Sequence, residues 1–82
     1  MAEIVPFPLC RRHGFITRQA SWFAEQSPSA AEKNLRRQID VQADALRRRG
    51  VADAVVEREC SALDAAIRAT ALRLLLSPGG VA

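Results

Sequence analysis

The sequence predicts an all-α fold, a small three-helix domain built on a long antiparallel helical hairpin with an extended N-terminal arm. Two long segments repeat apolar residues at helical spacing, and a shorter segment with a similar pattern precedes them. A glycine-containing stop separates the two long segments. With 82 residues, we expect one domain spanning 1–82, near the lower size at which a single core sustains a fold.

The first nine residues, 1–9, are expected to form the extended arm. Pro6 and Pro8 each fix their own φ and push the preceding residue towards extended geometry. The arm either packs across the helices and covers part of the core, or docks a partner. Packing is the simpler interpretation.

The first helix is expected over 11–26. Its apolar side comprises Phe15, Ile16, Ala20 and Phe23, with Gln19 and Trp22 beside them. Gly14 lies inside the pattern, so the first turn either frays or allows a close backbone crossing. Trp22 and Phe23 are adjacent and cannot both point fully inward, which makes the more exposed ring a candidate interface anchor.

The second helix is expected over 28–49, with two alternative starts. Ser27 caps it with Pro28 at the first helical position, or Ser29 caps it in a box with Glu32. Its core-facing stripe is Ala31, Leu35, Ile39, Gln42 and Leu46. Gln42 interrupts this stripe and is interpreted as a half-exposed or hydrogen-bonded polar residue, with a register-setting buried amide as the alternative.

The segment 47–51 has the pattern of a helix stop followed by a reversal. Gly50 suits the left-handed position after a helix, and Val51 would then contact Leu46, as in a Schellman motif. The arginines of the last turn, Arg47 and Arg48 among them, favour the negative end of the helix dipole. A link this short between two apolar stripes predicts antiparallel neighbours.

The third helix is expected over 53–77, with Asp53 as its N-cap and a loose tail at 78–82. Its regular heptad seam is Val56, Cys60, Leu63, Ile67, Thr70 and Leu74. In the last turns Leu72, Leu75 and Leu76 make the helix apolar all round. This end is therefore a candidate dimer or partner interface.

The composition of the chain indicates the cellular compartment in which we expect it and the kinds of partner it could bind. The net charge is +3, and eleven of the twelve basic residues are arginines. Two cysteines are too few for a secreted disulfide scaffold, and neither a signal peptide nor a membrane-length apolar segment is visible. We expect a cytoplasmic protein with free thiols and no membrane contact.

Catalytic and metal-binding motifs are weak. Cys10 and His13 have the spacing of half a metal site, but only Cys60 could add a soft ligand, whereas structural zinc takes four. There is no glycine-rich phosphate loop opening a helix, and the carboxylates have helical neighbours of opposite charge. We therefore expect no enzyme activity, no cofactor and no metal.

Nucleic-acid binding is the alternative function, as a small basic DNA- or RNA-binding regulatory protein. Phosphate recognition needs basic residues that converge on one face. The basic residues of the second helix are interleaved with Asp40 and Asp44, and its length does not suit a compact helix-turn-helix. These features argue against direct nucleic-acid binding.

The arm, the 47–51 stop, the 63–67 seam and the terminal 78–80 segment together resemble small alphaproteobacterial proteins of unknown function, common in rhizobia beside mobile elements. That group is similar to the QseM-type antiactivators of integrative and conjugative elements. The resemblance implies a helical protein that binds a transcriptional activator, in quorum sensing or mobile-element transfer control. Its motifs are architectural, so they favour a shared fold over a shared partner.

From these features we expect a non-enzymatic protein–protein interaction module, an antiactivator whose partner is a transcriptional activator. A second copy of the chain is an alternative partner. The candidate partner-binding residues are Trp22, Phe23, Val41, Arg47, Arg48, Leu72, Leu75 and Leu76.

Overall fold

The computed structural model describes residues 9–76, and within them it is helical with no strand, which confirms the all-α prediction. The elements are a 3-10 turn η1 (Leu9–Arg11) and the helices α1 (His13–Glu25), α2 (Pro28–Arg48) and α3 (Asp53–Leu76). Each helix matches its predicted range to within two residues at each end. The predicted tail and all but the last residue of the predicted arm lie outside the described residues.

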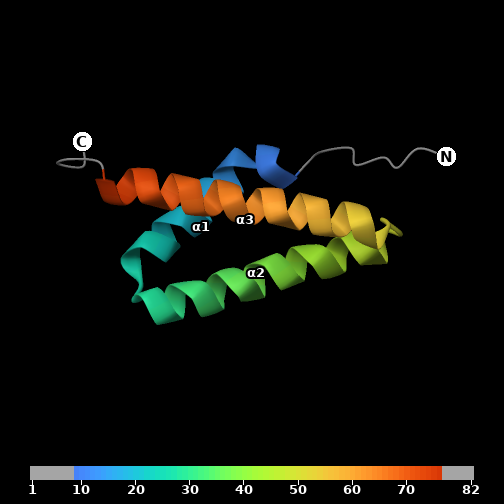
Figure 1. Cartoon of the computed structure of the whole chain (residues 1–82), viewed down its shortest axis with the longest axis horizontal. Coiled ribbons are helices and arrows are strands. Elements are labelled where there is room, and N and C mark those ends of the chain that lie inside the picture. Colours follow the sequence, from blue (N-terminus) through green and yellow to red (C-terminus); the bar gives the residue numbers. More distant parts are fainter. Residues whose placement is uncertain (1–8, 77–82) are drawn as a thin grey trace.

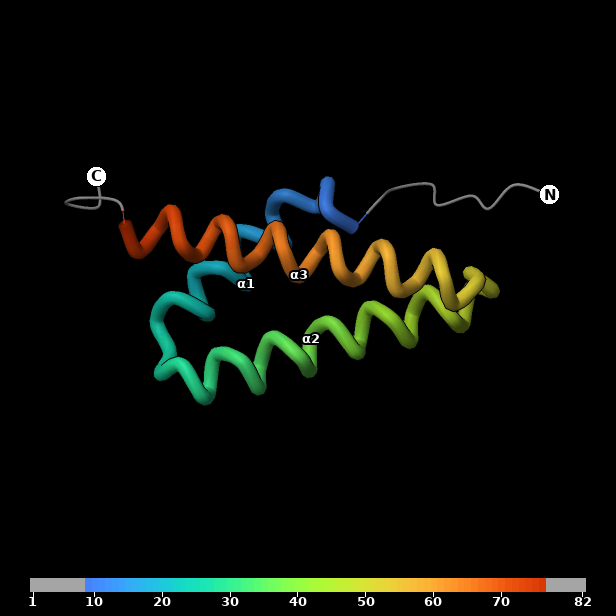
Figure 2. Tube along the Cα trace, viewed as in Figure 1, coloured from blue at the N-terminus to red at the C-terminus, as the bar shows by residue number. Residues whose placement is uncertain are grey.

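The helices form an elongated bundle that is open at one end (Figures 1 and 2). α2 and α3 run antiparallel from a tight turn, and they diverge along their length. α1 runs in the same direction as α3 behind it, contacts both other helices, and ends where α2 begins. α1 therefore packs where the hairpin opens, as the third helix of the predicted domain.

The turn between α2 and α3 is the predicted Schellman motif. Gly50 has φ +85°, and its N–H donates to the carbonyl of Arg47 at 2.9 Å. The N–H of Val51 donates to the carbonyl of Leu46 at 3.1 Å. Val51 is half-buried against the core cluster that contains Leu46. The prediction for this stop is confirmed in both its hydrogen bonds and its apolar contact.

The first residues of α2 and α3 decide between the two predicted caps of α2 and correct the predicted cap of α3. Ser27 caps α2, because its Oγ accepts from the N–H of Ala30 at 3.4 Å and Pro28 follows as the first helical residue. In α3 the carbonyl of Ala52 accepts from the N–H of Val56 at 2.9 Å. Ala52 therefore holds the cap position, and the prediction that Asp53 is the N-cap is wrong.

The core lies between the three helices and η1, and it combines aliphatic side chains with alanines. Its buried cluster is Leu9, Ile16, Ala20, Leu35, Ala43, Leu46, Val56, Cys60, Leu63, Ile67 and Ala71. The alanines let the helices approach closely, at the expense of buried area. Burial also raises the pKa of the Cys60 thiol, whose Sγ lies 3.9 Å from the Ile39 carbonyl oxygen.

The seam of α3 departs from its prediction near the C-terminus. Ala71 is 1% exposed and takes the inner position, whereas Leu74 is 45% exposed and Thr70 is only partly buried. The physical reason is the divergence of the hairpin, because no described residue of α2 reaches the last turn of α3 (Figure 1). A similar departure occurs in α2. The predicted stripe position Gln42 is only half-buried, and its neighbour Ala43 is buried in the core instead.

Gln42 is hydrogen-bonded, as the simpler of the two interpretations requires. Its Oε1 accepts from the Arg12 Nη1 at 2.8 Å, and the Arg12 guanidinium lies 4.7 Å from the centre of the Phe15 ring. The backbone N–H of Leu9 donates to the Glu59 Oε1 at 3.0 Å. These contacts fasten the start of α1 to α2 and η1 to α3.

A matched pair of glycine substitutions tests the turn. A Cβ at Gly50 or at Gly14 meets no heavy atom within 4 Å, so neither substitution creates a clash. Gly50→Ala should lower the free energy of unfolding by about 1 kcal/mol because of its positive φ. Gly14→Ala, inside α1, should raise it by up to about 1 kcal/mol. Urea unfolding followed by circular dichroism measures both, and a neutral Gly50→Ala would contradict the Schellman stop.

Candidate functional site

The most exposed apolar surface of the described chain is the end where α1 and α3 finish. We call it the leucine end, and its members are Trp22 (49% exposed), Leu72 (56%), Leu74 (45%), Leu75 (61%) and Leu76 (70%). Leu74 and Leu75 are exposed because α3 continues past Ala71, its last residue in the buried core, where the hairpin has opened. Leu72 and Leu76 are exposed because they lie on the side of α3 away from the core. An apolar cluster of this kind on a small protein marks an interaction site or an aggregation hazard.

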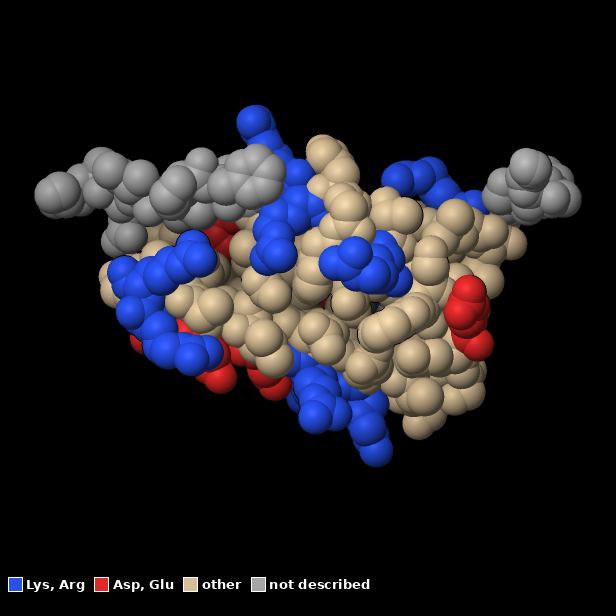
Figure 3. All heavy atoms as spheres, turned by 180° about the vertical axis from the view of Figure 1, so that it is seen from behind, with Lys and Arg blue, Asp and Glu red and all other residues tan. Residues whose placement is uncertain are grey.

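The charge distribution around this end is uneven. Figure 3 shows the molecule from behind, with uncharged side chains over most of the end where α1 finishes and acidic atoms at its edge, while the basic side chains form several separate groups on that face. Arg68 and Arg73 are the only charged residues of α3 after Asp64. The leucine end therefore carries no carboxylate from the last three turns of α3.

The structure divides the predicted partner-binding residues into two groups. Val41, Arg47 and Arg48 are exposed on the half of α2 next to the turn. Arg47 is held there by Asp53 at 3.2 Å and Asp44 at 3.7 Å. Because Asp53 opens α3, about 28 Å of helix separates this group from Leu72. The eight predicted residues do not form one surface.

Phe23 also differs from its neighbour Trp22. Its ring is partly buried against the core cluster, and the Arg68 guanidinium lies 5.6 Å from the ring centre. This arrangement confirms that only one of the two adjacent aromatic residues is largely exposed. Trp22, Leu72, Leu75 and Leu76 remain as the members of the predicted set at the leucine end.

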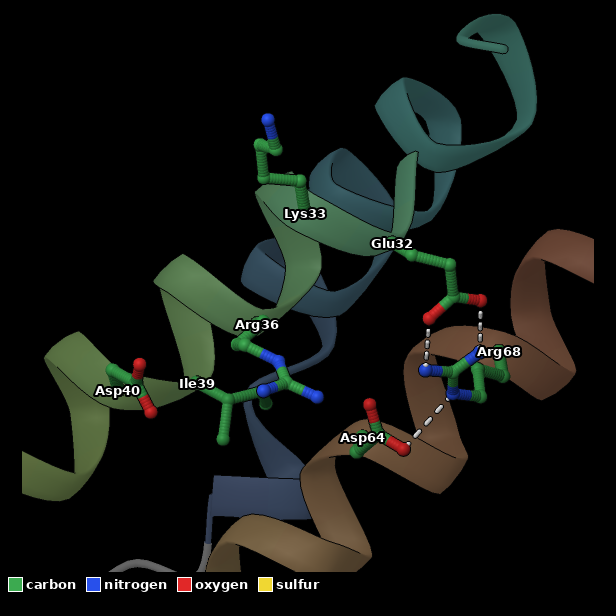
Figure 4. Close-up of a pocket in the computed structure, with 7 residues that line it drawn as sticks. All are labelled: Glu32, Lys33, Arg36, Ile39, Asp40, Asp64 and Arg68. Carbon is green, nitrogen blue, oxygen red and sulfur yellow. Dashed lines mark hydrogen bonds and ion pairs between the residues drawn. The ribbon is translucent and has the colours of Figure 1, made fainter. Parts of the chain in front are cut away.

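A polar groove lies between α2 and α3 and has a volume of about 520 Å³. It is lined by Glu32, Lys33, Arg36, Ile39, Asp40, Asp64 and Arg68. In Figure 4 the Arg36 guanidinium points into the groove, while Lys33 extends away from it. Glu32 and Asp64 approach Arg68 from two different helices. Three cations and three carboxylates thus line the groove, and their formal charges cancel.

Arg68 connects all three helices. Its Nη1 and Nη2 donate to the two Glu32 carboxylate oxygens at 2.6 and 2.7 Å, and its Nε donates to Asp64 at 2.9 Å. The hydrogen bonds from Arg68 lower the pKa of Glu32. The bonds from Glu32, and then from Asp64, raise the pKa of the Arg68 guanidinium. With the Phe23 ring beneath it, Arg68 is a clamp across the open part of the hairpin.

Half of this clamp follows from the sequence. The oppositely charged helical neighbours expected there include Asp64 and Arg68, which are spaced i,i+4 and form an ion pair. The Glu32–Arg68 pair was missed, although a signal for it exists. Residues of an antiparallel hairpin face each other when they are equally far from the turn, and the pairs Arg47–Asp53 and Glu32–Arg68 have the same midpoint, Gly50.

Two further findings concern the described residues alone. No group of three or more His, Cys, Asp or Glu side chains within 9–76 is arranged to hold a metal ion. Of the helices in this range, none combines the length and the apolar character that crossing a bilayer requires.

Over residues 1–82 the chain matches the model of a family of unknown function, DUF6074. The chain belongs to the DUF6074 family. Comparison with curated proteins and with solved structures gives no match for this DUF6074 chain. The expected membership in a family of unknown function is therefore confirmed, while the similarity to QseM-type antiactivators stays a hypothesis.

The lowered pKa of Glu32 predicts a pH-dependent contribution to stability. A carboxyl whose pKa falls on folding stabilises the fold above its unfolded value, near 4.5, and loses that contribution as the pH drops through its folded value. Glu32→Gln should therefore reduce the loss of thermal stability of this DUF6074 chain below about pH 4.5.

Glu57→Gln is the matched control, because Glu57 is exposed and makes no ion pair within residues 9–76. Melting temperatures measured by circular dichroism across the acidic range compare both variants with the parent. Identical acid profiles for the parent and Glu32→Gln would contradict the clamp.

Proposed function

We propose that this DUF6074 chain is a non-enzymatic protein–protein interaction module that binds and sequesters a transcriptional activator. The observation that carries the proposal is the leucine end. It exposes four leucines and a tryptophan on a domain with only 68 described residues. Covering such side chains is the main source of free energy available to this surface.

Trp22 and Leu75 offer a large gain in free energy on binding a partner, because both are large and substantially exposed. Burying a side chain of this size against a partner contributes about 1.5–3 kcal/mol, and tryptophan is over-represented among the residues that dominate interfaces. Arg73 lies next to these leucines and makes no ion pair in the described chain. It favours approach to an acidic partner surface, which raises the association rate more than the affinity.

The choice of a transcriptional activator as partner rests on the sequence resemblance to QseM-type antiactivators. The exposed side chains of the leucine end support the choice of docking surface, and they carry no information on which protein binds there. Direct nucleic-acid binding is the less supported function, because the basic side chains form several separate groups on the face seen in Figure 3, and Asp40 and Asp44 interrupt those of α2. Phosphate recognition needs arginines that are free to converge on a nucleic-acid backbone.

The test is a double variant, Trp22→Ala with Leu75→Glu, that removes an anchor and places a charge at the leucine end. Both side chains are largely exposed, so the helical circular dichroism should be unchanged. Tagged parent and variant proteins are expressed in the native host, purified, and analysed for co-purifying transcriptional activators by mass spectrometry. We expect at least a tenfold loss of the activator with the double variant.

Val41→Glu is the matched control, because Val41 has the same 49% exposure as Trp22 but lies far from the leucine end. It should retain the activator. If the double variant also retains the activator, the leucine end is not the binding surface. If the parent protein captures no activator at all, sequestration itself is refuted.

A further inference from the structure

The helix α3 is apolar on two opposite sides. One side faces the core through Val56, Cys60 and Ile67. The opposite side carries a second apolar series, spaced by four, three and four residues, which we call the outer stripe. Its members are Ala65, Ala69, Leu72 and Leu76, all of them exposed. A heptad-like series on the outside of a helix is the pattern with which a second helix packs.

The order of residue sizes along the outer stripe indicates which helix packs against it. The stripe has two small residues at its start and two large ones at its end. If an identical helix is laid antiparallel across it, Ala69 faces Leu72 of the second copy, and Ala65 faces Leu76. Each leucine then fills the space above an alanine, the alternation of large and small side chains that packs well. A two-fold axis makes this fit reciprocal.

We propose that a second copy of this chain packs antiparallel along the outer stripe of α3. The core of each copy lies on the other side of its α3, so the bundle leaves this side of the helix accessible. Between Ser61 and Leu76 the stripe itself carries no charged residue, and the pairing therefore buries no charge.

Charge complementarity agrees with the antiparallel arrangement. Arg58 is exposed and continues the line of the outer stripe towards the start of α3. In the register that joins Ala65 to Leu76, Arg58 lies about 10 Å beyond the level of Leu76, on the side of the negative end of the neighbouring α3. The attraction of this cation to the helix end is weak at that distance, and the two antiparallel helix dipoles also attract each other. A parallel pair would lose both attractions.

The area of the contact sets the expected strength. The outer stripe covers about three helical turns, which is well below the ~800 Å² per partner of a standard interface. We therefore expect a reversible dimer with a dissociation constant on the order of 10–100 μM. The outer stripe shares Leu72 and Leu76 with the leucine end, whereas Trp22 and Leu75, the residues changed to test the proposed function, lie outside it. The exchange variants below therefore test the dimer separately from partner capture.

The test exchanges the facing residues. Ala69→Leu should place leucine against leucine and weaken the dimer at least tenfold, and Leu72→Ala should do so by leaving a gap. The double variant Ala69→Leu with Leu72→Ala restores one large and one small residue at the contact. It should return the dimer to within about threefold of the parent. Sedimentation velocity over a range of protein concentrations measures each dissociation constant.

The controls keep the outcome decisive. Val41→Ala, on the exposed side of α2, should leave the dissociation constant unchanged, and circular dichroism should show the same helicity for all variants. The pair Ala65→Leu and Leu76→Ala repeats the exchange at the other contact. A parent protein that stays monomeric up to about 500 μM overturns the proposal. The proposal is also overturned if the single changes weaken the dimer and neither double exchange restores it. A different surface would then form the dimer.

Discussion

The positive φ of Gly50 is the constraint on which the rest of the molecule depends. It lets α2 stop and reverse within four residues, with two backbone hydrogen bonds and the Val51 contact closing the end of the helix. Because the link is this short, the facing residues of α2 and α3 are set at the turn and not by the core. The corner therefore determines which side chains of two long helices meet.

This pairing of facing residues in α2 and α3 explains both the clamp around Arg68 and the exposed leucines away from the turn. It brings Glu32 to Arg68 near the open end of the hairpin, where the clamp holds α2 and α3 with α1 beneath it. Beyond Arg68 the hairpin has diverged, and the last turns of α3 lose their cover. The exposure of Leu74 and Leu75 thus follows from a third helix that is longer than the core it completes, whereas the outer stripe is exposed because it lies on the side of α3 away from the core. A surface of this kind suits a module that acts by association.

Much of the fold could be predicted, because helix periodicity and end signals are local properties of the sequence. The left-handed position of Gly50, the return of Val51 to Leu46 and the hydrogen-bonded role of Gln42 follow from local spacing. The Glu32–Arg68 contact follows from spacing about the turn, whereas the inner position of Ala71 could not be predicted, because it depends on where the two helices separate. For the same reason the predicted binding residues were scattered, since Val41 and Leu72 looked equivalent until the hairpin placed them at opposite ends.

The most direct test of this account is the distance between α2 and α3 across the hairpin. Spin labels introduced as unnatural amino acids at Lys33 and Ala65, in chains diluted with unlabelled protein, avoid the native cysteines and contacts between copies. An antiparallel hairpin predicts one short distance, on the order of 20 Å, since packed helix axes lie about 8–10 Å apart. One continuous helix through Gly50 would separate the labels by about 48 Å, and that result would contradict the corner and every surface derived from it.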